Sequence, residues 1–158
     1  MNETVQNLAN TLRQLGWQLC TAESCTGGLI AGACTDLAGS SDWFDRGFVT
    51  YSNAAKVEML SVPLHLIDQH GAVSEPVARA MAEGALAHSK AQVSVAVTGV
   101  AGPSGGSADK PVGTVWFAWC LNGKTSSERQ HFDGDRAAVR GATVSHALSG
   151  LMARLIKS

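Results

Sequence analysis

A serine lies where an apolar stretch gives way to a helix-like run. Residues 21–28, with the sequence TAESCTGG, lead directly into Leu29 and the apolar positions after it. Glycines let a ligand approach the backbone closely, and the free N–H groups of a first helical turn favour an anion or a developing oxyanion. Ser24 is therefore a candidate nucleophile. The binding candidates beside it are Cys25, Thr26, Gly27 and Gly28.

The same run also has a purely structural interpretation, in which Ser24 or Thr26 caps the helix and the glycines permit close packing. A serine hydroxyl is a poor nucleophile at neutral pH and needs a base. The chain has no G-x-S-x-G elbow, and none of its five histidines lies in a context that indicates a Ser-His-Asp triad. The sequence leaves open a histidine that is adjacent only in space.

Tyr51 and Lys56 lie at a second expected junction between a strand and a helix. In an α/β sheet both junctions face the crevice at the strand ends. The helix dipole disfavours a cation in a first turn by about 0.3–1 kcal/mol, which favours neutral Lys56, and burial acts in the same direction. A solvated Lys56 would stay charged and inert. Tyr51, the only tyrosine, is either a proton relay or a half-buried strand aromatic whose hydroxyl finds a partner.

A glycine-rich loop over residues 98–113 follows the most apolar expected strand. It matches neither a Walker loop nor G-x-G-x-x-G, but a glycine-rich turn after a buried strand fits backbone recognition of a nucleotide's amide, ribose or phosphate. The alternative is a long flexible connection. The binding candidates in this loop are Thr98, Gly99, Ala101, Gly102 and Gly105.

Two arginines follow the turn at residues 133–135. Arg136 and Arg140 lie one turn apart at the expected start of the last helix. A helix N-terminus with a guanidinium can hold a phosphate, so both arginines are candidates for substrate binding. Solvated arginines after an Asp cap would give the same pattern.

Helix and strand patterns alternate along the chain. Helices are expected near residues 5–15, 29–37, 53–60, 75–86 and 135–156, and strands near 17–22, 44–51, 93–97, 114–121 and 125–132, with a hairpin turn at Asn122-Gly123. This alternation predicts an α/β fold, in which a mixed, mostly parallel sheet is flanked by helices. No linker or repeat divides residues 1–158, so a single domain is expected.

The composition narrows the class of protein. The 158 residues are 45% hydrophobic and 16% charged, with a net charge of -1, which describes one globular domain without the charge of a polyanion binder. We expect a small-molecule partner, no nucleic acid and no membrane. Four cysteines without a C-x-x-C pair and five histidines without a metal-binding pattern predict no metal and reduced thiols in the cytoplasm. The oligomeric state is left open, a homo-oligomer included.

Five blocks of sequence in the same order resemble the CinA C-terminal domain family, and the resemblance covers nearly the whole chain. They are AESCTGG at 22–28, GFVTYSN at 47–53 with Lys56, GAVSE at 71–75, GVAGPSGG at 99–106 and KPVGTVW at 110–116. The resemblance implies a nicotinamide-nucleotide amidase that converts nicotinamide mononucleotide to nicotinic acid mononucleotide and ammonia, in pyridine-nucleotide recycling, without a metal or other cofactor. It is closest to the stand-alone form, without the large N-terminal domain of two-domain members.

The resemblance places the nucleophile on Ser24 and an assisting pair on Tyr51 and Lys56. The expected reaction is attack of Ser24 on the carboxamide carbon, with Lys56 as base, directly or through Tyr51, while backbone N–H groups hold the oxyanion. Three alternatives remain at this point. They are a non-catalytic nucleotide-binding module, a competence-related adaptor in DNA uptake or repair, and an amidase for another heteroaromatic amide.

Overall fold

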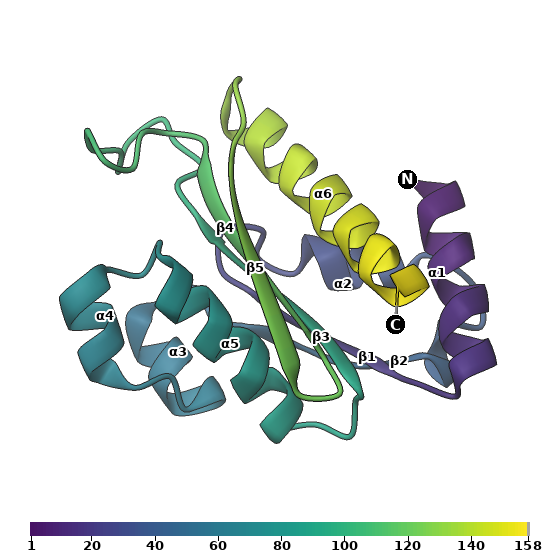
Figure 1. The fold of residues 1–158 in the computed structure, drawn as a ribbon. Coiled ribbons are helices and arrows are strands. Elements are labelled where there is room, and N and C mark those ends of the chain that lie inside the picture. The colour runs from purple at the N-terminus through teal and green to yellow at the C-terminus, as the bar shows by residue number, and fades with distance from the viewer. Residues whose placement is uncertain (158) are drawn as a thin grey trace.

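Five strands form one twisted sheet with helices on both faces (Figure 1). The computed structural model describes residues 1–157; Ser158, the last residue of the expected domain, lies outside them. The strands are β1 (Leu19–Glu23), β2 (Phe44–Val49), β3 (Val93–Gly99), β4 (Thr114–Leu121) and β5 (Lys124–His131). Their order is β2-β1-β3-β4-β5, with β1 parallel to β2 and β3, and β4 antiparallel to β3 and β5. The predicted α/β class and mixed sheet are confirmed.

Three helices cover one face of the sheet. They are α1 (Asn2–Leu15), α2 (Leu29–Thr35) and α6 (Arg136–Lys157), and Figure 1 shows α1 and α6 on the same side. Strands β3 and β4 present large apolar side chains to this face, among them Val95, Phe117 and Trp119. The helices bury Leu12 and Leu151 against them. Burying such side chains is worth about 1.5–3 kcal/mol each, so this layer is the main core.

The opposite face carries α3 (Asn53–Leu60), α4 (Leu64–His70) and α5 (Glu75–Ala87). Here the strands present small side chains such as Ala96 and Ala118, and α5 packs closely on them. Helix α3 in turn packs against α5 at Gly84, where an added Cβ would lie 2.0 Å from the carbonyl oxygen of Leu60. The end of α3 is therefore held backbone to backbone against α5.

The connections explain where a ligand can enter. Helix α2 joins β1 to β2 over one face, whereas α3, α4 and α5 join β2 to β3 over the other. Because these connections run over opposite faces on either side of β1, a crevice forms beyond the carboxyl ends of the parallel strands, the usual ligand site of such sheets. Both predicted junctions open into this crevice.

The expected boundaries need small corrections. The strand expected to continue to Tyr51 ends at Val49, and the helix expected to reach Leu37 ends at Thr35. Helix α4 is not predicted, because seven residues are too few to show a helical repeat. Helix α6, the longest of the chain, is not apolar enough to cross a membrane, and no other helix of residues 1–157 qualifies.

Candidate active site

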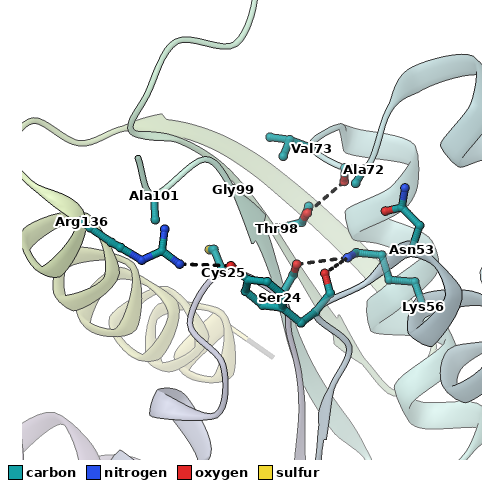
Figure 2. A pocket seen from close by; sticks show the side chains of 11 residues that line it. Ser24, Cys25, Asn53, Lys56, Ala72, Val73, Thr98, Gly99, Ala101 and Arg136 are labelled. Carbon is teal, nitrogen blue, oxygen red and sulfur yellow. Dashed lines mark hydrogen bonds between the residues drawn. The ribbon is translucent and has the colours of Figure 1, made fainter. Parts of the chain in front are cut away.

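A cavity of about 240 Å³ lies beyond the ends of β1 and β3 (Figure 2). It joins the two predicted junctions, because Ser24 and Cys25 line it beside Tyr51 and Lys56. Four more of the predicted site residues line it as well: Thr98, Gly99, Ala101 and Arg136. The sequence interpretation missed three lining residues, Asn53, Ala72 and Val73, although all three belong to blocks of the resemblance.

Lys56 reaches from α3 directly to the serine after β1. Its Nζ lies 3.1 Å from Ser24 Oγ, 3.0 Å from the carbonyl oxygen of Thr50 and 3.3 Å from that of Tyr51. Figure 2 shows the two side chains pointing toward each other. Lys56 is 1% exposed and Ser24 is 8% exposed. The alternative of a solvated surface lysine is therefore wrong.

The environment of Lys56 favours the neutral amine. Burial lowers its pKa from the usual 10.5, and no carboxylate is bonded to Nζ within residues 1–157. A neutral amine has two N–H donors and one lone pair. Two carbonyl oxygens, of Thr50 and Tyr51, are in place for the N–H donors. The lone pair is then left to accept the Ser24 hydroxyl proton, which is the geometry of a general base.

The start of α2 is capped by a residue that the sequence interpretation did not single out. The buried Glu23 carboxylate accepts from the Thr26 hydroxyl at 2.5 Å and from the amide N–H groups of Ile30 and Ala31, each at 2.9 Å. The capping interpretation of Ser24 or Thr26 is therefore wrong, because Glu23 takes the free donors of the helix. The one signal was a glutamate closing an apolar strand shortly before a helix.

Arg140 holds the turn between β1 and α2. Its Nε donates to the carbonyl oxygen of Cys25 at 3.1 Å, and its Nη2 donates to that of Thr26 at 3.2 Å. Because C=O and N–H point in opposite directions across a planar trans peptide, a Cys25 carbonyl drawn toward Arg140 turns the Thr26 N–H away from it. That N–H has no acceptor within residues 1–157, whereas the N–H of Gly27 donates to the Ser24 carbonyl. The Thr26 N–H is thus a free donor close to Ser24, and the Cys25 N–H likewise has no backbone acceptor within residues 1–157.

Arg136 joins two loops at the other side of the cavity. Its Nη1 donates to the carbonyl oxygen of Gly102 at 2.9 Å, and its Nη2 donates to the Tyr51 hydroxyl at 3.1 Å. Tyr51 is 61% exposed and follows the end of β2, so it is not a half-buried strand aromatic, although its hydroxyl does have the partner that this interpretation expected. The Thr98 hydroxyl is bound to the carbonyl oxygen of Ala72 at 2.9 Å. Arg136 and Lys56 are the two basic side chains among the residues that line the cavity.

Several predicted binding residues do not line the cavity. They are Thr26, Gly27, Gly28, Gly102, Gly105 and Arg140. Gly28 adopts φ 104°, a left-handed conformation that suits glycine and lets the chain enter α2. Gly105, also left-handed, is an exposed residue of the glycine-rich loop. Their part in binding stays a prediction.

Other reactive groups are remote from this site. Within residues 1–157 no histidine lines the cavity, and no group of three or more His, Cys, Asp or Glu side chains is arranged to hold a metal ion. Burial raises the pKa of the adjacent Cys25 thiol to about 11, which keeps it protonated and a poor nucleophile. The fold and the site therefore define an α/β protein with a buried serine–lysine pair, an arrangement suited to nucleophilic hydrolysis.

The chain belongs to the CinA C-terminal domain family, whose model matches residues 1–155. It is 51% identical to the nicotinamide-nucleotide amidohydrolase PncC of Enterobacter agglomerans, over 100% of this chain and 97% of that protein. It is 57% identical to the protein of the same name from Pseudomonas putida, over 92% and 91%. The crystal structure of the competence/damage inducible protein CihA from Agrobacterium tumefaciens superposes with a TM-score of 0.93 at 49% identity, covering 96% of this chain and 93% of that one.

Proposed function

We propose that this chain is a nicotinamide-nucleotide amidohydrolase that uses Ser24 as its nucleophile and Lys56 as its base. The observation that carries the mechanism is the 3.1 Å contact between Lys56 Nζ and Ser24 Oγ inside the cavity. The names of the full-length relatives support the reaction, which converts nicotinamide mononucleotide to nicotinic acid mononucleotide and ammonia.

The reaction begins when Ser24 Oγ bonds to the carboxamide carbon and its proton passes to Lys56 Nζ. The carbonyl oxygen becomes an oxyanion that the Thr26 N–H stabilises; one such donor is worth about 10²–10³ in rate. The carbon–nitrogen bond then breaks, and the Lys56 ammonium gives its proton to the leaving nitrogen, which departs as ammonia. An acyl ester on Ser24 remains.

Hydrolysis of this ester uses the same two side chains. Water attacks the acyl carbon while Lys56 takes one of its protons, and that proton returns to Ser24 Oγ as the ester bond breaks. The carboxylic acid product leaves, and Ser24 and Lys56 return to their starting states. Tyr51 helps to position the base, since its carbonyl oxygen accepts a hydrogen bond from Lys56 Nζ.

Arg136 accounts for a nucleotide substrate. It lines the cavity on the side away from Lys56 (Figure 2), and its nearest partners are a carbonyl oxygen and a phenol rather than a carboxylate. A guanidinium without an acidic partner suits a phosphate group. Gly99 and Ala101 also line the cavity, and we assign the ribose to these small residues. The four cysteines are free and buried, which suits a cytoplasmic enzyme whose partner is this small substrate.

The test is ammonia release from nicotinamide mononucleotide by the purified protein and by Ser24→Ala, with product identified by mass spectrometry. We expect activity in the first and none above background in the second. Ser104→Ala, a change at an exposed loop serine, is the matched control and keeps full activity. Equal release by wild type and Ser24→Ala would remove Ser24 as nucleophile. Binding of the nucleotide without release would indicate the non-catalytic module instead.

A further inference from the structure

Asn53 carries a free amide at the cavity wall. Six cavity residues have hydroxyl, amide or charged side chains, and five of them have hydrogen-bond partners: Ser24, Tyr51, Lys56, Thr98 and Arg136. No partner is found within residues 1–157 for the side chain of Asn53. Asn53, an exposed residue, therefore offers a bound substrate both an acceptor Oδ1 and a donor Nδ2.

The position of Asn53 relates this amide to one part of the reaction. Asn53 is the first residue of α3 and lies three residues before Lys56, so the two share a helix face. Figure 2 shows Asn53 and Lys56 on one side of Ser24 and Arg136 on the other. A substrate with its phosphate at Arg136 and its reacting carbon at Ser24 therefore extends toward Asn53 only with the atoms beyond that carbon.

Those atoms are the carboxamide oxygen and nitrogen. The oxygen is directed to the free N–H of Thr26, as the oxyanion requires. The nitrogen must then lie on the side of Lys56, which protonates it as it leaves. Asn53 is beside Lys56 on this side and offers a side-chain amide oxygen that is still free to accept a hydrogen bond.

We propose that Asn53 is a specificity residue that accepts a hydrogen bond from the carboxamide nitrogen through Oδ1. The inference rests on the proposed amidohydrolase activity and names the group of the substrate that this part of the cavity recognises. With one N–H held by Asn53, the nitrogen lone pair that forms as the carbonyl carbon becomes tetrahedral faces the Lys56 ammonium. An ester at the same carbon has no N–H and gains nothing from Asn53.

The experiment compares two substrates, nicotinamide mononucleotide and the methyl ester of nicotinic acid mononucleotide. Asn53→Ala is expected to lower kcat/KM about 10-fold for the amide, the effect of one hydrogen bond. For the ester, measured as methanol release, the change stays within about 2-fold because no such bond is lost. The amide-to-ester ratio of kcat/KM is the readout, since a general loss of structure would not alter it.

Ser52→Ala is the matched control at the same helix start. The Ser52 hydroxyl caps α3 by accepting from the Ala55 N–H at 3.0 Å, so its loss weakens the helix without touching the substrate. It is expected to leave the ratio unchanged, even where it lowers both rates. If Asn53→Ala lowers kcat/KM equally for both substrates, or changes it for neither, the role of Asn53 is overturned while the proposed activity stands. If wild type releases neither ammonia nor methanol, the proposed function fails and this inference with it.

Discussion

The hydroxyl of Tyr51 accepts a hydrogen bond from Arg136 at 3.1 Å, whereas Tyr51 meets Lys56 only through its backbone carbonyl, 3.3 Å from Nζ. The side chain that was expected to relay a proton is thus engaged on the other side of the cavity. Lys56 contacts Ser24 without an intermediary. This arrangement supports the proposed role of Lys56 as the direct base.

Tyr51→Phe is accordingly expected to lower kcat by no more than about 10-fold, because it removes one partly exposed hydrogen bond. Steady-state kinetics with nicotinamide mononucleotide measure the effect. A fall in kcat as large as that of Lys56→Met would show that the Tyr51 hydroxyl carries the proton after all.

Arg136→Ala should raise KM for the mononucleotide by about 10–100-fold, since a hydrogen bond to a charged group is worth roughly 1.5–3 kcal/mol. For nicotinamide riboside, which lacks the phosphate, KM should change little. Arg129→Ala, at an exposed arginine bound to the Asp109 carbonyl, is the control and leaves both substrates unaffected. An equal rise in KM for the nucleotide and the riboside would argue against a phosphate contact.

Lys56→Met is expected to abolish turnover and to change how stability depends on pH. Burial lowers the folded-state pKa of Lys56 below 10.5, so the unfolded chain binds more protons between the folded-state pKa and 10.5. The stability of wild type therefore rises with pH across this window, relative to the variant. Urea unfolding of both proteins from pH 7 to 10.5 measures the difference, and a constant difference would mean that Lys56 is not perturbed.

The pH dependence of kcat/KM should also report the protonation of Lys56. With the neutral Lys56 amine as the proposed base, kcat/KM of wild type is expected to rise with pH through the lowered pKa of Lys56 and to level off above it. A profile that rises only near 10.5 would contradict a base of this kind.

Arg140→Met should lower kcat by about 10–100-fold with little change in KM, because the turn that aims the Thr26 N–H loses both of its guanidinium bonds. The split between kcat and KM separates this positioning role from the phosphate contact suggested by the sequence. A raised KM with unchanged kcat would favour the phosphate contact.

Glu23→Gln is expected to destabilise the protein by about 1–3 kcal/mol, because glutamine offers one acceptor oxygen where three donors converge and turns an NH₂ group toward a buried N–H. Thermal unfolding measures the loss. Glu58→Gln, at an exposed position of α3, should be neutral. A neutral result for Glu23 would mean that the start of α2 does not depend on this carboxylate.

Much of this site could be predicted from local sequence, because strand-to-helix junctions place Ser24 and Lys56 at one edge of a sheet whatever else the chain does. The burial of Lys56 could not, since it depends on packing among α3, α5 and the sheet. Arg140 has the sequence pattern of a solvated arginine, and its partners lie more than a hundred residues earlier. Asn53 stands at the start of a predicted helix, and only the assembled structure shows that its side chain lines the cavity.

The contact between Gly84 and Leu60 bears on which substitutions the enzyme tolerates. Any side chain at position 84 would push the Leu60 carbonyl away and tilt α3, and Lys56 would leave Ser24 with it. Gly84 does not line the cavity. In a saturation library scored for turnover, substitutions at Gly84 should nevertheless be as damaging as substitutions at Ser24. Inactivating variants of this enzyme can therefore arise on a helix that does not contact the substrate.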